Sequence, residues 1–166
     1  MPTYPTEQLR NLALLSHSGC GKTSLVEALL FSSGAISRLG RVEDGNTSGD
    51  YEPEAANRGG STQLSILPCP WKNHKITLID TPGYFDFLGD AESALRVADA
   101  GILVVAANAG VEVGTEQMWA RIQTQNLPCF IVVNKLDREN TNFLPIVDRL
   151  RDVFGKQCVP IQIPIG

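Results

Sequence analysis

A short glycine-rich stretch between an apolar run and a helical pattern constrains the fold more than any other feature. Residues 12–15 are apolar, and residues 16–24 read Ser-His-Ser-Gly-Cys-Gly-Lys-Thr-Ser. From residue 22 onward, apolar side chains recur at positions 25, 26, 29 and 30, which is helical spacing. This order predicts a phosphate-binding loop, where backbone N–H groups and the positive end of the helix meet phosphate oxygens. The loop departs from the usual pattern at its first position, where Ser16 replaces glycine.

We expect this loop to supply the phosphate contacts of a nucleotide. The Lys22 ammonium would reach the β- and γ-phosphates, and the Thr23 hydroxyl would ligate Mg²⁺. His17 follows the strand and is expected to shape the loop rather than to perform catalysis. A plain strand–helix turn with an exposed lysine would carry the same letters, so the loop alone does not decide. The predicted nucleotide-binding residues here are His17, Ser18, Gly19, Cys20, Gly21, Lys22, Thr23 and Ser24.

Strand and helix patterns alternate along the rest of the chain. Residues 101–106 and 129–133 are continuously apolar, as in strands buried on both faces of a parallel sheet. Further strands are predicted at 12–15, 64–67, 75–79 and 159–163, and helices at 22–31, 87–98, 115–125 and 142–154. The predicted fold is α/β, of the P-loop NTPase type: a doubly wound, mostly parallel sheet with helices on both faces and its ligand site at the carboxyl ends of the strands.

A second motif, Asp80-Thr81-Pro82-Gly83, follows the strand predicted at 75–79. Asp80 stands where phosphate-loop enzymes place the acidic residue that holds magnesium. Gly83 has no Cβ, so its backbone N–H can approach a γ-phosphate. Thr-Pro-Gly is also an ordinary turn signal. Its position downstream of the glycine loop favours the functional interpretation.

A third motif, Asn134-Lys135-Leu136-Asp137, follows the last continuously apolar strand. The Asp137 carboxylate can accept hydrogen bonds from N1 and N2 of guanine, a donor pair that adenine lacks. Against adenine the carboxylate would stay unpaired, which costs kilocalories. The three motifs in this order therefore predict GTP or GDP rather than ATP. A phosphate-loop ATPase or kinase remains a distant alternative.

Composition limits the other classes. The chain has 166 residues, 43% of them apolar, and a net charge of −4, so no direct nucleic-acid binding is expected. Its four cysteines have no paired spacing, which favours free thiols in a reducing cytosol. No signal peptide is visible, and the longest apolar run, 100–107, falls far short of the roughly 20 residues of a membrane span. A cytoplasmic location without a membrane partner is expected.

With these motifs the chain resembles the G domain of translational GTPases, most closely elongation factor G and its paralogues. The resemblance rests on residues 16–23, 80–87, 134–137 and 160–166 and covers essentially the whole chain. It also explains Ser16, because translation factors place alanine or glycine there, followed by histidine. The resemblance implies a P-loop GTPase that hydrolyses GTP to GDP and phosphate on the ribosome, with Mg²⁺ as cofactor.

The resemblance assigns a role to a polar segment that has no period of its own. Residues 33–63 hold six glycines and would form the first switch, ordered by the γ-phosphate. Arg58-Gly59-Gly60-Ser61 resembles the family's Arg-Gly-Ile-Thr, which makes Ser61 a magnesium ligand beside Thr23 and Asp80. The expected layout is an extension at 1–10, the G domain at 11–158, and a segment at 159–166 that leads into an inserted subdomain.

The chain departs from the family pattern in ways that bear on activity. Tyr84 replaces the histidine that orients the attacking water, and a phenol, with an ordinary pKa near 10, is no base at neutral pH. Gly19 replaces an aspartate, and no Ser-Ala-Leu loop for guanine follows. We therefore expect a piece of a longer protein, without the last strand and helix of the G domain, whose own activity is low.

The expected site can be stated residue by residue. The candidate catalytic residues are Lys22, Gly83 and Tyr84; the nucleotide ligands outside the loop are Asp80, Gly83, Asn134, Lys135 and Asp137; and the metal ligands are Thr23, Ser61 and Asp80. Two alternatives stay open. One is a sister translational GTPase of the release-factor-recycling or ribosomal-protection type. The other is a GTP-binding module with very slow hydrolysis.

Overall fold

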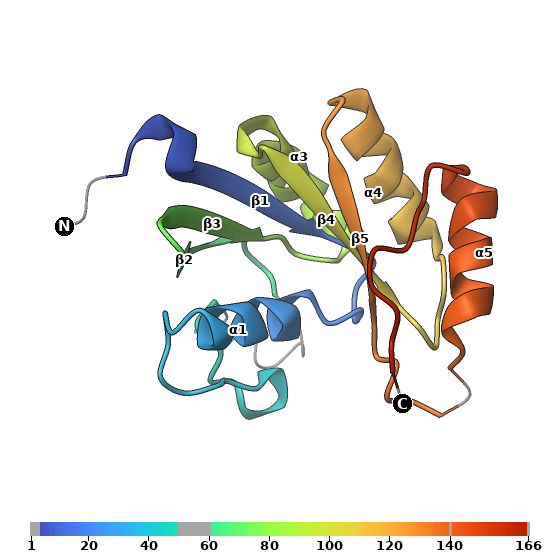
Figure 1. Cartoon of the computed structure of the whole chain (residues 1–166), viewed down its shortest axis with the longest axis horizontal. Helices are drawn as coiled ribbons and strands as arrows, with labels where there is room; N and C mark the ends of the chain where they lie inside the picture. The colour runs from blue at the N-terminus through green and yellow to red at the C-terminus, as the bar shows by residue number, and fades with distance from the viewer. Residues whose placement is uncertain (1–3, 50–60, 140, 166) are drawn as a thin grey trace.

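A computed structural model describes residues 4–49, 61–139 and 141–165 (Figure 1). The described part contains one five-stranded sheet with the strand order β2-β3-β1-β4-β5. β2 pairs with β3 antiparallel, and all other neighbours are parallel. The strands are β1 (Leu9–Leu15), β2 (Ser65–Trp71), β3 (His74–Asp80), β4 (Ala100–Ala106) and β5 (Cys129–Asn134).

Helices cover both faces of the sheet (Figure 1). They are α1 (Lys22–Ser32), α3 (Leu88–Val97), α4 (Val113–Thr124) and α5 (Phe143–Phe154), with short 3₁₀ turns at Thr6–Gln8, Val42–Asp44 and Phe85–Phe87. Alternate residues of one strand point to opposite faces, so Leu14 packs with α1 while Ala13 and Leu15 pack with the helices of the other face. The predicted doubly wound, mostly parallel α/β fold is confirmed.

The central strands are buried as their continuous apolar sequences predict. Every residue of β4 is buried, and β4 lies between β1 and β5. The chain enters β1 at Leu9, earlier than the predicted strand at 12–15, because Leu9 and Arg10 pair with β3 although they are exposed. The apolar pattern therefore marks only the buried half of this strand.

β2 extends further than its apolar pattern predicts. The strand predicted at 64–67 continues to Trp71 through Pro68 and Pro70. Proline lacks an N–H donor and is tolerated in a strand only at a sheet edge. β2 is the edge strand beside β3, so its outer side needs no donors from these residues.

Two helix starts illustrate different capping chemistry. The Asn142 side chain accepts a hydrogen bond from the Leu144 N–H at 3.2 Å, so it caps α5 as the sequence predicts. The helix predicted from Thr115 begins earlier, at Val113. Glu112 is its N-cap, and Thr115 hydrogen-bonds back to the Glu112 N–H in a reciprocal capping box.

The strand predicted at 159–163 is wrong. These residues form no strand, and Val159, Ile161 and Ile163 are 69%, 79% and 68% exposed. Pro160 and Pro164 remove two N–H donors, and in the described structure no strand pairs with this segment. The alternating apolar pattern is real, but nothing in the described part of the chain covers its apolar side.

The polar segment predicted at 33–63 is described up to residue 49 and again from residue 61. The prediction for Arg58, Gly59 and Gly60 lies outside the described residues. Apart from the turn at Val42–Asp44, residues 33–49 form no regular structure, as their sequence predicts. No helix among the described residues is both long and apolar enough to pass through a lipid bilayer.

Candidate functional site

The loop between β1 and α1 lies at the carboxyl ends of the parallel strands, the edge where this class of sheet binds ligands. Two of its glycines adopt left-handed backbone conformations, Gly19 with φ 77° and Gly21 with φ 89°. Gly21 is the N-cap of α1, so the free N–H groups of the first helical turn face this edge. The sequence folds this way because glycine alone adopts such angles without strain.

Lys22 begins α1 and is 6% exposed. Its Nζ donates a hydrogen bond to the Ser16 hydroxyl at 2.9 Å. Ser16, which breaks the usual loop pattern, is thus itself a polar partner of the lysine. A buried ammonium is costly unless it is hydrogen-bonded, and this geometry supplies one such partner.

Gly83 lies directly against the loop. A Cβ at this position would come within 2.7 Å of Lys22 Nζ and 2.8 Å of Ser18 Cα. The Gly83 backbone therefore lies beside the lysine head group, and no other residue type fits without moving the loop. Thr81, two residues earlier, ties the strand ends together by donating to the Leu14 carbonyl at 2.6 Å.

Three buried oxygen-bearing side chains from distant parts of the chain meet at the start of α1. The Thr23 hydroxyl donates to Asp80 Oδ2 at 2.7 Å, and Thr23 Oγ1 lies 3.0 Å from Ser61 Oγ. Thr23, Ser61 and Asp80 are 9%, 8% and 1% exposed. The sequence motifs predict Thr23 and Asp80 as metal ligands, and the family resemblance adds Ser61. We refer to these three residues as the oxygen cluster.

The oxygen cluster suits a hard cation. Mg²⁺ prefers oxygen donors and is commonly held by one or two carboxylates together with substrate phosphates and water. Among the described residues, no group of three or more His, Cys, Asp or Glu side chains could hold a metal by itself. A site with one carboxylate, two hydroxyls and phosphate oxygens therefore fits magnesium better than it fits zinc.

Two side chains of the third motif hydrogen-bond to backbone carbonyls of the phosphate loop. Asn134 Nδ2 donates to the Cys20 carbonyl at 2.9 Å, and Lys135 Nζ donates to the Gly19 carbonyl at 2.6 Å. Lys135 has a φ of 61°, which is rare for a residue with a Cβ and marks a constrained turn. That turn is closed by a hydrogen bond from the Arg138 N–H to the Lys135 carbonyl.

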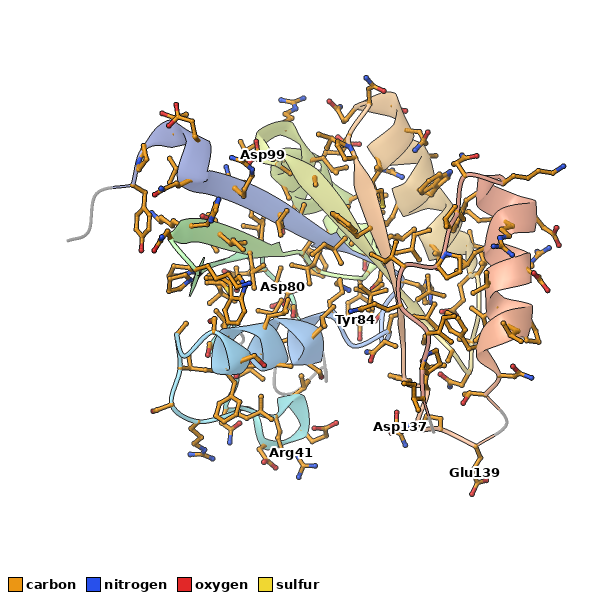
Figure 2. All side chains as sticks on the ribbon, in the orientation of Figure 1. Arg41, Asp80, Tyr84, Asp99, Asp137 and Glu139 are labelled. Carbon is orange, nitrogen blue, oxygen red and sulfur yellow. The ribbon has the colours of Figure 1, made fainter. Side chains whose placement is uncertain are left out.

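Asp137 and Tyr84 lie in different parts of this edge. Figure 2 shows Asp137 on the loop that follows β5, well separated in this view from Asp80 and Tyr84. The Asp137 side chain is exposed, whereas Tyr84, which adjoins Gly83, is partly buried. Asp137 and Asp80 of the oxygen cluster therefore lie at different places along this edge of the sheet (Figure 2).

The outer side of the phosphate loop contacts the start of α4. His17 Nε2 lies 3.6 Å from Glu112 Oε1, and the Cys20 thiol contacts Glu112 Oε2 at 3.9 Å. A Cβ on Gly114 would lie 2.5 Å from His17 Nδ1, so the imidazole rests on the backbone of α4. The His17 side chain thus packs between the phosphate loop and the start of α4.

The remaining loop residues divide by exposure. Cys20 is 1% exposed and packs in the apolar cluster beneath α1, so its side chain is hardly accessible from solvent. Ser24 lies on the exposed side of α1, and Ser18 is partly buried. At Cys20, only the backbone N–H group would therefore be able to contact a phosphate.

Burial makes two of the four cysteines poor nucleophiles. All four are free thiols. Burial raises the pKa of Cys129 to about 11 and also raises the pKa of Cys158. Since the thiolate is the nucleophile, these two thiols are poorly reactive at neutral pH.

Some residues that build the site could not be assigned from the sequence. Ser16 carries no signal there beyond a missing glycine, and the contacts of Glu112 require the tertiary structure. Glu27 was detectable, because it lies four residues after Thr23 and so shares its helix face. A glutamate on the buried face of a helix is uncommon and needs a partner.

Residues 7–162 match the family described as the Elongation factor Tu GTP binding domain. The chain belongs to this family. It is 35% identical to elongation factor G 2 of Borreliella afzelii over 95% of its length, and 36% identical to elongation factor G of Granulibacter bethesdensis over its whole length. A solved structure of a protein from Thermus thermophilus superposes with a TM-score of 0.86 at 42% identity over 89% of the chain and 22% of that protein.

Family membership confirms the prediction of a translation-factor G domain that binds guanine nucleotide. The chain spans about a quarter of the length of these curated relatives, 24% in both cases. The strand order and helix placement of this GTP-binding domain agree with that assignment.

Proposed function

We propose that this GTP-binding domain serves a translation factor of the elongation factor G type, which hydrolyses GTP to GDP and phosphate on the ribosome in the cytoplasm. The convergence of the oxygen cluster, Lys22 and Gly83 at one edge of the sheet carries this proposal. These groups would bind a γ-phosphate and neutralise part of its charge. The similarity to two proteins named elongation factor G supports the ribosomal role.

Each group at this edge of the sheet would have its own role in binding the nucleotide. Lys22 would leave Ser16 to neutralise charge on the β- and γ-phosphates, and the N–H groups at the start of α1 would bind the phosphate oxygens. The Gly83 N–H would approach the γ-phosphate from the opposite side. Residues 33–63 would act as the first switch, because Ser61, close to the end of that segment, contacts Thr23 of α1.

Thr23, Ser61 and Asp80 would hold Mg²⁺. Magnesium, when bound, neutralises charge that develops on the transferring phosphoryl group. In the structure Thr23 is hydrogen-bonded to both other members of the oxygen cluster, so the three oxygens are already close together. Asn134, Lys135 and Asp137 would hold the guanine at the far end of the site.

The experiment that tests the proposed function compares nucleotides and ribosomes. The 166-residue chain should bind GTP and GDP but not ATP in a fluorescence assay with labelled nucleotides. The longer protein should hydrolyse GTP faster when ribosomes are added. Equal affinity for ATP and GTP, or a rate insensitive to ribosomes, would contradict the proposal.

Tyr84 favours a second candidate function, a GTP-binding module with very slow hydrolysis. Its phenol adjoins Gly83, where the attacking water would lie, and tyrosine supplies no general base at neutral pH. We predict that Tyr84→His accelerates single-turnover GTP hydrolysis on ribosomes by about tenfold or more, because a positioned imidazole can orient and deprotonate water. Rapid-quench measurement with the longer protein gives this rate.

Tyr84→Phe is the matched control for this prediction. It keeps the ring but removes the hydroxyl, so its rate should equal that of the parent protein or fall below it. If Tyr84→His and the parent protein hydrolyse GTP at the same rate, Tyr84 does not limit hydrolysis.

Ser61→Ala tests the switch. Removing the hydroxyl should raise the Mg²⁺ concentration that gives half-maximal GTP binding by about tenfold, since one charge-assisted ligand is lost. GDP binding should change little, because the oxygen would be recruited only with a γ-phosphate. Ser93→Ala on the exposed side of α3 is the control, and it should leave both titrations unchanged. An equal change for GTP and GDP would contradict the switch assignment.

A further inference from the structure

A buried glutamate on α1 stands one helical turn from the oxygen cluster. Glu27 is 1% exposed and lies four residues after Thr23, so both side chains share one face of α1. A carboxylate with so little contact to water is stable only when hydrogen bonds satisfy its charge. Its partners therefore indicate what it is for.

Among the described residues, two backbone N–H groups donate to Glu27, and both belong to the segment that precedes Ser61 of the oxygen cluster. The Gly40 N–H donates to Glu27 Oε2 at 3.0 Å, and the Ser48 N–H donates to Glu27 Oε1. The fit is close at Gly40, where a Cβ would come within 2.8 Å of Glu27 Oε2 and 2.6 Å of the Asn46 carbonyl. One carboxylate thus holds both ends of the turn that runs from residue 40 to residue 48.

Further hydrogen bonds hold this turn together and attach it to the sheet. The Arg41 N–H donates to Asn46 Oδ1 at 2.7 Å, and Thr47 is 5% exposed. The Ser65 hydroxyl of β2 donates to the Gly49 carbonyl at 2.9 Å. The turn is therefore fixed to α1 by Glu27 and to β2 by Ser65.

We propose that Glu27 is a positioning residue of the GTP-bound state. By fixing the turn 40–48 on α1, it sets where the following chain starts and so favours the placement of Ser61 against Thr23. This inference rests on the proposed function, in which Ser61 completes the shell around Mg²⁺ with a γ-phosphate present. The hydrogen bonds described above for Lys22, Asn134 and Lys135, which would bind GDP, run to the phosphate loop rather than to this turn.

The test is Glu27→Gln in the 166-residue chain. Glutamine has the same shape, but its NH₂ group would face a backbone N–H, so one of the two hydrogen bonds is lost. Affinities are measured with Mg²⁺ and fluorescent forms of GDP and of GTPγS, which resists hydrolysis. The expected result is a loss of about tenfold for GTPγS, as one charge-assisted bond predicts, with GDP affinity within about twofold of the parent chain.

The control is Glu43→Gln, the same substitution at an exposed position within the turn. It should leave both affinities unchanged. Gly40→Ala is a second variant, whose Cβ would push the turn away from Glu27. It should reproduce the selective loss of GTPγS affinity, and it keeps the inference testable if Glu27→Gln does not fold.

The outcomes separate the inference from the proposed function. If the parent chain binds neither nucleotide, both are overturned. If the parent chain binds both, but the folded Glu27→Gln variant loses GDP and GTPγS affinity equally or loses neither, only the inference is overturned. A merely structural glutamate would lower the melting temperature without changing the ratio of the two affinities, so that ratio is the decisive readout.

Discussion

Replacing Gly21 by alanine is expected to lower the affinity for both GTP and GDP by about 10²–10³-fold. Gly21 has a φ of 89°, and a Cβ there would lie 2.5 Å from Asn134 Nδ2. Left-handed backbone costs a residue with a Cβ about 1–2 kcal/mol, and overpacking costs about 1–3 kcal/mol more. Either the start of α1 or the Asn134 side chain, which hydrogen-bonds to the phosphate loop, must move. Both lie where phosphates would bind.

Gly19→Ala separates the two causes of this effect. Gly19 has a similar φ of 77°, but nothing lies within 4 Å of a Cβ placed there. Alanine at this position should therefore carry only the cost of the left-handed backbone, a loss of affinity of about 5- to 30-fold. Isothermal titration calorimetry on both variants, with circular dichroism to verify folding, measures the difference. Equal losses would show that contact with Asn134 plays no part.

The fold could be predicted because its strongest signals are local. The continuously apolar β4 is buried at every residue, and Asn142 caps α5 as its chemistry requires. The errors come from tertiary context. Proline at 68 and 70 argues against a strand unless the strand is known to lie at the sheet edge, and the apolar alternation at 159–163 forms a strand only with a partner to pair with.

The candidate site divides in the same way. Its three motifs follow strands, and the sheet brings their ends together, so their proximity follows from the fold class. Side-chain contacts between separate segments of the chain produce no comparable pattern in the sequence. Nothing in the letters shows that Ser16 accepts from Lys22, or that Glu27 holds Gly40 and Ser48. These contacts depend on chain geometry rather than on spacing.

The prediction with the clearest chemical reason concerns Asp137. Asp137→Asn should lower GTP affinity by about 10²–10³-fold, because an asparagine NH₂ group would face the amino group of guanine, and hydrogen bonds to a charged group are worth about 1.5–3 kcal/mol each. The same variant should gain affinity for xanthosine triphosphate. Xanthine has an N1–H donor and a C2 carbonyl acceptor, which match the oxygen and the NH₂ group of asparagine.

Competition between labelled GTP and each unlabelled nucleotide measures this exchange of specificity. Asp152→Asn, an exposed position on α5, is the matched control and should leave GTP binding intact. The gain for xanthosine triphosphate matters more than the loss for GTP, because a misfolded loop would lose both. Asp137 lies just beyond the constrained turn at Lys135, and the Lys135 ammonium donates a hydrogen bond to the Gly19 carbonyl. A variant that binds xanthine nucleotides must therefore keep that turn and the phosphate loop in place, and it would show that this one carboxylate selects the base.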